Sequence, residues 1–295
     1  MKRIEKIWRE IKRPFRQLKH VIVDDLVSKA ELIGLSNELK AGLIQAEHNI
    51  VQSVQQELRQ TSAQKTENSI PIKSYCPICQ HGSAQPFSDF RGRTNAICNN
   101  CGSLERHRFL WLAFTTLTNG TSVSDCSCLH FAPEPCFQQH FQTLFGDNYY
   151  TGDIQPGRAK YEVDITNICF SENKFDYIVC SHVLEHVIED ITALKELYRV
   201  LKVGGLAFLS VPMRDGNTYE DYNITSPEER EKHFKQYDHV RHYGRDDFAD
   251  RVKSVGFHVE KISPNNIIRH EGLLRLFGIA RKAASKYIVA ASRTQ

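Results

Sequence analysis

Hydrophobic and polar positions follow two different periods along the chain, and the change of period falls near residue 127. Between residues 24 and 59, apolar side chains recur every three or four positions, which predicts a long helix, either in a coiled coil or in a two-helix hairpin. From residue 127 onward, short apolar runs alternate with stretches of helical periodicity. Such alternation predicts an α/β domain whose parallel sheet is covered by helices on both faces.

The individual elements of this α/β part follow from the same pattern. Uninterrupted apolar runs predict buried strands, whereas apolar positions spaced by three or four predict helices. The expected helices span residues 136–144, 191–201 and 245–255, and another at 104–117 precedes the α/β part. The expected strands span residues 128–131, 148–152, 161–164, 175–180, 205–211, 257–262 and 286–291, the last two separated by a basic, leucine-rich excursion at 267–282.

The first twenty residues form a basic amphipathic pattern that is interrupted at Pro14. Eight lysines and arginines stand against two glutamates there, while apolar side chains recur at helical spacing. Such a segment can lie on an anionic membrane surface, or it can pack on its own protein or on another subunit. We therefore expect residues 1–70 to be a helical segment, with a polar linker at 60–69, that provides a homo-oligomer contact or a peripheral membrane contact.

Composition narrows the class of protein. Of the 295 residues, 41% are hydrophobic and 25% are charged, which is usual for globular proteins and excludes collagen-like or wholly disordered chains. No window reaches the roughly 18 apolar residues of a membrane-spanning helix, and we read no secretory signal. We therefore expect the cytoplasm, where nine cysteines do not form a disulfide framework. A net charge of +3 does not by itself indicate a nucleic-acid binder.

Four of the cysteines occur as two C-x2-C pairs separated by eighteen residues. This spacing is expected for a zinc ribbon, in which four thiolates close a tetrahedral shell without a position for water. A dithiol redox motif is the alternative, but it needs only one pair. The basic residues near the pairs lack aromatic interleaving, so docking on the rest of the chain is favoured over nucleic-acid contact. The predicted ligands of a structural zinc ion are Cys76, Cys79, Cys98 and Cys101.

Three blocks of the α/β part, beginning at Phe175, Ala193 and Leu206, carry the most specific signal. They read FDYIVCSHVLEHV, ALKELYRVLKVGG and LAFLSVP. Together they resemble the class I methyltransferases that use S-adenosylmethionine, and the preceding CGSLERHRFLW is similar to the lead-in of a bacterial subgroup of these enzymes. The resemblance spans residues 127–291 and implies a Rossmann-like, seven-stranded methyltransferase sheet. The expected domains are a helical segment at 1–70, the ribbon with a connecting helix at 71–120, and a methyltransferase domain at 121–295.

The resemblance also implies a cofactor site at the strand ends, where ligands of open parallel sheets lie. In this family, Asp153 would accept the ribose hydroxyls, and Asp164 with the backbone of Ile165 would receive the adenine edge. Ser181 and His182 would lie near the methionine end and the reactive methyl group. An aspartate at a strand end can also simply cap a turn.

The first turn of the expected cofactor site departs from the family pattern. Glycines there let the backbone approach the cofactor, but this chain has Ala132-Pro133-Glu134, with His130 in the usual acidic place. Pro133 offers no amide donor, and Glu134 adds an anion near the cofactor carboxylate. Ala132, Pro133 and Glu134 remain predicted cofactor-binding residues, and either the turn binds differently or binding has been weakened or lost.

His182 is the candidate catalytic residue, because an imidazole can take a proton from an acceptor near neutral pH. A capping role, or one in orienting the substrate, is the alternative. The HVLEH run that starts at His182 also fits the inverted zinc-protease signature H-x-x-E-H. That chemistry needs both histidines on one helical face, whereas here the run begins at a strand end. We therefore interpret Glu185 and His186 as packing and capping residues.

A second polar cluster follows a polar insertion at 215–235, a place that borders the acceptor in many members of the family. His239 and Arg241 of this cluster are predicted to bind the acceptor substrate, which would be anionic or hydroxylated. A solvated loop with internal ion pairs is the alternative.

The sequence thus predicts S-adenosylmethionine-dependent methyl transfer. No Asn/Asp-Pro-Pro-Tyr element of the exocyclic amino methylases is present, so the expected acceptor is a hydroxyl group of a glycan or a small molecule. One alternative is an RNA base methyltransferase, since some such enzymes also carry a zinc module. The other is a non-catalytic scaffold whose degenerate first turn no longer holds the cofactor.

Overall fold

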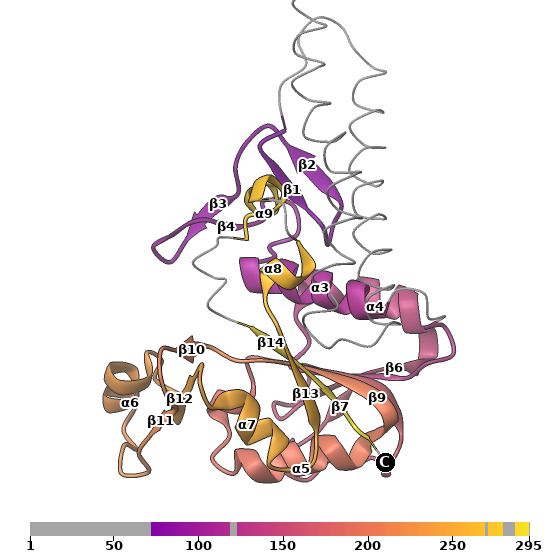
Figure 1. Cartoon of the computed structure of the whole chain (residues 1–295), viewed down its shortest axis with the longest axis vertical. Helices are drawn as coiled ribbons and strands as arrows, with labels where there is room; N and C mark the ends of the chain where they lie inside the picture. The colour runs from indigo at the N-terminus through magenta and orange to yellow at the C-terminus, as the bar shows by residue number, and fades with distance from the viewer. Residues whose placement is uncertain (1–71, 119–122, 269–270, 280–286, 295) are drawn as a thin grey trace, which may run out of the picture. The chain divides into compact units, whose positions relative to one another are not determined.

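The computed structural model describes residues 72–118, 123–268, 271–279 and 287–294 (Figure 1). The N-terminal segment predicted at 1–70, with its coiled-coil, oligomer and membrane-surface interpretations, lies outside the described residues. Among the residues described, the helices are all too short or too polar to cross a membrane. The expected cytoplasmic location stays a prediction.

A seven-stranded sheet in the order β13-β14-β9-β8-β5-β6-β7 forms the centre of the α/β part. Neighbours among β5 to β9 pair in parallel, whereas β14 runs antiparallel to both β9 and β13. The Rossmann-like, seven-stranded methyltransferase sheet predicted from the sequence is confirmed, and the sheet is mixed because β14 runs antiparallel to both of its neighbours. The strands are β5 (Cys128–Phe131), β6 (Tyr149–Asp153), β7 (Tyr161–Glu162), β8 (Phe175–Ser181), β9 (Leu201–Ser210), β13 (His258–Ile262) and β14 (Ile288–Ser292).

The apolar runs explain the central strands. Every residue of β8 except Asp176 is buried, as a strand covered on both faces requires. Strand β9 begins at Leu201 and not at the expected residue 205, because the two glycines lie in an irregularity where Leu201 pairs with Phe175 and Leu206 with Tyr177. A β-carbon on Gly205 would meet backbone oxygens at 2.9 Å, so only glycine fits this bulge.

Helices cover both faces of the sheet, with α3 and α4 on one side and α5 and α7 on the other (Figure 1). Helix α5 buries an apolar face whose side chains recur every three or four residues, from Ala193 to Val200. Helix α7 is shorter than the expected 245–255. The helices here are α3 (Glu105–Leu117), α4 (Pro135–Phe145), α5 (Asp190–Val200) and α7 (Phe248–Lys253), with 3-10 turns η2 (Gly146–Asn148) and η3 (Leu184–His186).

The polar insertion is folded, which the sequence pattern did not predict. It contains strand β11 (Tyr219–Glu220) and helix α6 (Pro227–Phe234), and β11 forms a small sheet with the flanking strands β12 (Arg241–Gly244) and β10 (Met213–Arg214). Partly buried ion pairs connect this sheet to the helices: Arg251 contacts Asp190 at 2.6 Å and Glu220 at 3.1 Å. The Tyr243 hydroxyl donates to Asp190 at 2.6 Å. The insertion therefore holds its side chains in fixed positions next to α5.

The ribbon consists of two antiparallel hairpins that lead into α3, namely β1 (Ser74–Cys76) with β2 (His81–Ser83) and β3 (Ser88–Phe90) with β4 (Arg93–Ile97). The leucine-rich excursion between β13 and β14 contributes α8 (Pro264–Ile267) and α9 (Glu271–Leu276), and α9 contacts β1 (Figure 1). Residues 70–114 and 121–295 form one compact unit. The domain boundaries at 70 and 120 stay predictions, while the excursion packs with the ribbon.

Arg108 joins the ribbon to the excursion. Its fully buried guanidinium donates to the carbonyls of Phe277 at 2.6 Å, Ser103 at 2.7 Å and Ala96 at 3.1 Å. It also lies 4.0 Å from the centre of the Phe87 ring. The cationic side chain is therefore satisfied by backbone acceptors from three segments, as burial of a charge demands.

Candidate functional site

The carboxyl ends of the parallel strands meet at one edge of the sheet. Phe131 of β5 pairs with Gly152 of β6 on one side and with Cys180 of β8 on the other. The residues that follow these three therefore lie next to one another, as the topology of an open parallel sheet requires. This edge, here called the strand-end edge, comprises Ala132, Pro133, Glu134, Asp153, Asp164, Ile165, Ser181 and His182, the residues that the resemblance assigned to the cofactor.

The first turn keeps the shape of a glycine turn without a glycine. Ala132 has φ +45°, in the left-handed region that glycine adopts most easily. Its amide donates to the Gly152 carbonyl at 2.8 Å, and α4 then begins with Pro135. Alanine adds only a β-carbon, so Ala132 holds in this turn a backbone conformation that favours glycine.

Glu134, the anion expected beside the cofactor, is paired with a histidine of the protein. The Nε2 atom of fully buried His130 lies 2.8 Å from Oε2 of Glu134, and the Nδ1 atom lies 2.8 Å from the Tyr149 hydroxyl. Burial alone would raise the pKa of Glu134, but the hydrogen bond and charge of His130 outweigh it and lower that pKa. The Glu134 carboxylate is thus paired with the histidine that replaces the usual acid of this strand.

Two side chains of α3 belong to the electrostatic surroundings of this edge. The Nε2 atom of His107 lies 3.8 Å from Oε1 of Glu134, and burial with the charge of Arg106 lowers the pKa of His107 to about 3. Burial lowers the pKa of Arg106 as well, while the charges of Glu134 and Glu185 act in the opposite direction. Within the described residues, Arg106 Nε has no hydrogen-bond partner. Arg106 is therefore a cation at the strand-end edge with a donor to spare.

The two aspartates at the edge both cap turns. Oδ1 of Asp153 accepts from the Gln155 amide at 2.8 Å. Oδ1 of Asp164 accepts from the Thr166 amide at 2.8 Å and from its hydroxyl at 2.7 Å. These bonds involve one oxygen of each carboxylate, so the capping alternative is present and does not preclude a ligand at the second oxygen. The ribose and adenine roles of Asp153 and Asp164 stay predictions.

His182 occupies a strained position directly after β8. It has φ +57°, and its amide donates to the Ser210 carbonyl at 2.8 Å. Non-glycine residues in this region are uncommon and cluster at functional sites. Its Nδ1 atom lies 3.1 Å from Oε1 of Glu185, and its side chain is 28% exposed, so one ring edge faces Glu185 while the ring stays accessible.

Glu185 is the buried partner of His182. The sequence analysis assigned Glu185 only to packing and capping. Its side chain is 1% exposed. Burial alone would raise its pKa, but contact with His182 and the charges of His182 and His186 lower it. The turn around it is the 3-10 turn η3, which starts after His182, so the two histidines of the HVLEH run do not share the helical face that the protease signature needs.

The predicted acceptor ligands lie on the loop and strand beside Glu185. The Val240 amide donates to the Glu185 carbonyl at 2.9 Å, which brings His239 to η3. Arg241 is fully buried, with its guanidinium 2.8 Å from Glu220 and 2.8 Å from the Ile188 carbonyl. As an acceptor ligand Arg241 stays a prediction, and its contacts favour a structural role.

The comparison with protein families decides the class. Residues 125–262 match the sequence model of a family described as a methyltransferase domain. This stretch of the α/β part is therefore similar to a methyltransferase domain. The match covers the strands β5 to β9 and reaches the end of β13, so it contains every residue of the strand-end edge.

Solved structures similar to this chain are methyltransferases among others. The YcgJ protein of Bacillus subtilis is 15% identical, covers 64% of this chain and 100% of its own, and has a TM-score of 0.41. Phosphoethanolamine N-methyltransferase 2 of Haemonchus contortus, in complex with S-adenosyl-L-methionine, is 14% identical, covers 66% of this chain and 53% of its own, and has a TM-score of 0.41. These likenesses carry no conclusion on the acceptor. A comparison with curated proteins finds no match.

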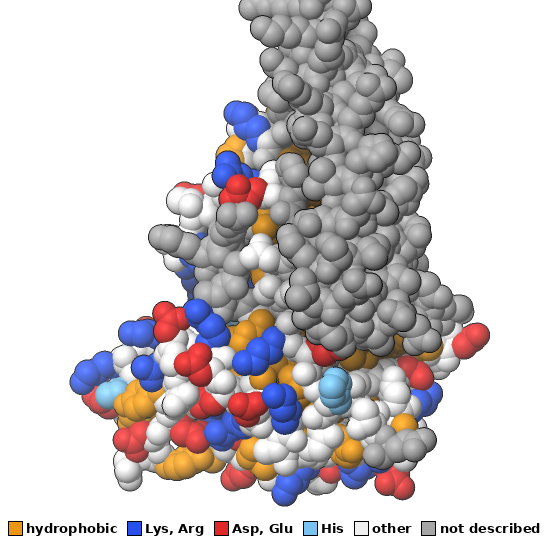
Figure 2. All heavy atoms as spheres, viewed as in Figure 1, with side chains coloured by type: hydrophobic (Ala, Val, Ile, Leu, Met, Phe, Trp, Pro, Cys, Tyr) orange, Lys and Arg blue, Asp and Glu red, His pale blue; other side chains and the backbone are white. Residues whose placement is uncertain are grey.

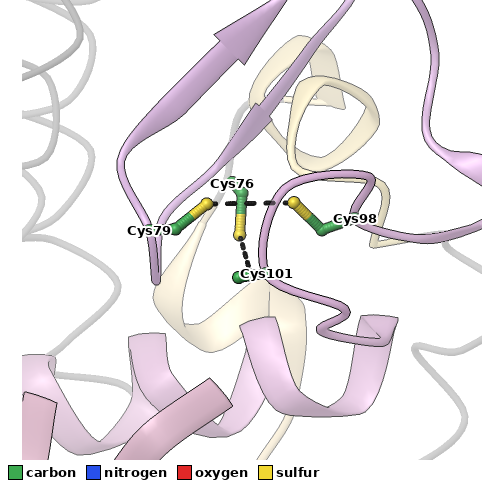
Figure 3. Close-up of side chains that lie close together, drawn as sticks. All are labelled: Cys76, Cys79, Cys98 and Cys101. Carbon is green, nitrogen blue, oxygen red and sulfur yellow. Dashed lines mark hydrogen bonds between the residues drawn. The ribbon is translucent and has the colours of Figure 1, made fainter. Parts of the chain in front are cut away.

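The four ribbon cysteines converge on one point beside the methyltransferase domain (Figure 3). The sulfur atoms of Cys76 and Cys101 are 3.7 Å apart, and those of Cys79 and Cys98 are 3.8 Å apart. A tetrahedral ion with zinc–sulfur bonds of about 2.3 Å has sulfur–sulfur edges of about 3.8 Å, so this donor set fits zinc. The hydroxyl of Ser103 lies within hydrogen-bond distance of Cys76 and Cys101, where it can donate to a thiolate.

Proposed function

We propose that the protein transfers a methyl group from S-adenosylmethionine to a hydroxyl group of a glycan or a small molecule. The observation that carries this proposal is the contact between His182 and buried Glu185 at the end of β8, 3.1 Å between Nδ1 and Oε1. A hydroxyl acceptor must lose a proton, and a histidine oriented by a carboxylate is the arrangement that takes one. His182 is the proposed base, and the Glu185 carboxylate lies against its Nδ1 atom.

The strand-end edge supplies a suitable set of groups for the cofactor. When bound, S-adenosylmethionine supplies an activated methyl group on a sulfonium. Asp153 would accept the ribose hydroxyls, and Asp164 with the Ile165 amide would receive the adenine. The left-handed Ala132 keeps the first turn tight, and pairing with His130 compensates the charge of Glu134. Arg106, with a free Nε, is the proposed partner of the cofactor carboxylate.

Zinc in the ribbon is proposed to be structural. Four thiolates at tetrahedral spacing close the shell, so the ion has no position for water or substrate. The ion would fold the ribbon, and the ribbon would hold α3 and hence Arg106 against the strand-end edge. Zinc thereby affects cofactor binding only through the position of α3.

The test is calorimetric titration of the zinc-loaded protein with S-adenosylmethionine and with S-adenosylhomocysteine. Micromolar binding of both is expected, and transfer of a labelled methyl group to hydroxylated glycans and small molecules would then identify the acceptor. No binding of either ligand would overturn the proposal and favour the non-catalytic scaffold.

The salt dependence of methylation distinguishes an RNA acceptor from a hydroxylated glycan or small molecule. Contacts to phosphates weaken steeply as salt rises, whereas a neutral hydroxylated acceptor is insensitive to it. On the face drawn in Figure 2, Lys and Arg side chains are interspersed with Asp and Glu, which does not provide the single-sign surface that favours RNA. Methylation of RNA that disappears at high salt would replace the proposed acceptor.

A further inference from the structure

Three side chains outside the ribbon also come together in the way metal ligands do. Glu185, His186 and His239 each offer one ligand atom, and these atoms lie within 4.8 Å of one another. Glu185 and His186 belong to η3, while His239 precedes β12. The backbone bond from the Val240 amide to the Glu185 carbonyl, 2.9 Å long, fixes the two segments against each other. The cluster is thus held by the fold and does not depend on long flexible side chains.

The carboxylate of Glu185 lacks the partners that its burial calls for. The residue is fully buried, and within the described residues neither carboxylate oxygen has a hydrogen-bond partner. His182 Nδ1 lies 3.1 Å from Oε1 without completing a well-directed hydrogen bond. Buried charges in proteins are as a rule paired or coordinate a metal, so this carboxylate has room for one more cationic contact.

Both histidines of the cluster are oriented through Nδ1. In His186 this atom lies 3.3 Å from Oδ2 of Asp238, and in His239 it lies 3.2 Å from the Phe234 carbonyl. Histidines that bind metals use just such carboxylate and carbonyl partners to hold one nitrogen, which leaves the other for the ion. The two ring centroids are 4.7 Å apart with an interplanar angle of 84°. Each ring therefore has Nε2 left for a shared ligand.

We propose that Glu185, His186 and His239 bind a divalent transition-metal ion next to His182. Two imidazoles and one carboxylate suit Mn²⁺, Fe²⁺ or Zn²⁺, and three protein ligands leave coordination positions open, as in catalytic metal sites and unlike the ribbon.

The use of the ion rests on the proposed function. A cation beside the acceptor hydroxyl lowers the pKa of that hydroxyl. In the proposed reaction the hydroxyl proton would pass to His182 while the methyl group moves from the sulfonium sulfur to the hydroxyl oxygen, and S-adenosylhomocysteine would be the leaving product. Metal binding itself does not depend on this step.

In the experiment, the ribbon is first loaded with zinc. The protein is then titrated with Mn²⁺, and free Mn²⁺ is measured by electron paramagnetic resonance. Thiolates select zinc, whereas Mn²⁺ prefers oxygen and nitrogen ligands, so the probe reports on the second site alone. We expect one Mn²⁺ per chain at micromolar concentrations. His186→Gln and His239→Gln should each weaken binding at least tenfold. His233→Gln, in the same insertion but in contact with Tyr219 and Glu229, is the matched control and should bind as the wild type does.

The outcomes separate folding, metal binding and methyl transfer. His186 is partly exposed, so His186→Gln carries the test even where replacement of buried Glu185 disturbs the fold; zinc content and melting temperature show that the variant is intact. The proposal is overturned if wild-type protein leaves Mn²⁺ free up to millimolar concentrations, or if intact His186→Gln and His239→Gln keep full affinity. Binding of S-adenosylhomocysteine without binding of Mn²⁺ would contradict the metal site alone. Binding of Mn²⁺ without binding of S-adenosylhomocysteine would contradict the proposed function alone.

Discussion

The two clusters of metal-type ligands in this chain differ in how they are assembled. The cysteine cluster comes from two short turns close together in sequence, one between β1 and β2 and one between β4 and α3, and its four identical soft ligands close the shell. The cluster of Glu185, His186 and His239 joins a 3-10 turn to a loop more than fifty residues later, and its three ligands would leave coordination positions free on a bound ion. A site formed by local turns can therefore be predicted from residue spacing, whereas a site formed by tertiary packing can be recognised only in the folded structure.

Loss of one cysteine is expected to have the largest effect, because the ribbon has little core of its own. In Cys98→Ser, three thiolates remain, and much of the zinc contribution to folding, on the order of 10 kcal/mol for small zinc modules, is lost. We expect zinc content near zero and loss of the ribbon's cooperative unfolding, measured by metal analysis and thermal melting. Cys169→Ser, at an exposed position, is the control. A Cys98→Ser protein that keeps its zinc and its melting temperature would contradict the structural role of the cysteine cluster.

His182, which lies beside the cluster of Glu185, His186 and His239, is expected to affect turnover and not stability. His182→Ala should lower turnover by about 100- to 10,000-fold, the range for loss of a general base, while affinity for S-adenosylhomocysteine stays within about twofold. The measurement is single-turnover kinetics together with calorimetry, with His81→Ala on the exposed ribbon strand β2 as the control. Unchanged turnover would remove His182 as the base.

Two glycine substitutions test how much the contact between the ribbon and the excursion contributes to stability. A β-carbon on Gly278 would lie 2.5 Å from Phe87 in addition to straining a residue at φ +59°. Gly278→Ala should therefore lower the free energy of unfolding by about 2 to 4 kcal/mol, combining left-handed strain with overpacking. Gly157→Ala, at φ +78° with nothing near its β-carbon, isolates the strain and should cost about 1 kcal/mol. Equal losses in urea denaturation would show that the contact with Phe87 is dispensable.

The smallest expected effect concerns the strand-end edge. Asp153→Ala should weaken binding of S-adenosylhomocysteine about tenfold, close to 1.4 kcal/mol, because one acceptor for the ribose is lost. Asp147→Ala, an exposed aspartate in η2, should bind as the wild type does in the same calorimeter. Identical affinity in both variants would contradict the placement of the ribose on β6.

Sequence patterns predicted the strands well because their causes are local. The expected strand at 128–131 coincides with β5, and the strand ends placed Ala132, Asp153 and Ser181 at one edge, since register in a parallel sheet follows from the apolar runs. The match to a methyltransferase domain confirms the class that the three blocks indicated.

Features that depend on distant contacts were not predicted. The β10-β12-β11 sheet is held by ion pairs from Asp190 and Glu220, and a polar insertion gives no periodicity by which to foresee it. Arg106 looked like one more basic residue near the ribbon until α3 placed its charge beside Glu134. In the sequence, the partial burial of Arg106 was indicated only by the CGSLERHRFLW run, because its closely spaced basic and apolar side chains cannot all face solvent.

The bonds of Arg108 bear on the order in which the protein can finish folding. Its acceptor on Phe277 lies 169 positions further along the chain. A chain emerging from the ribosome exposes all four ribbon cysteines long before that carbonyl has been made, so zinc can be captured while the guanidinium still lacks its last partners. Closure of such a distant loop is slow and comes late. With the proposed zinc ion, the ribbon would therefore bind its metal early and be among the last parts of the molecule to reach its final packing.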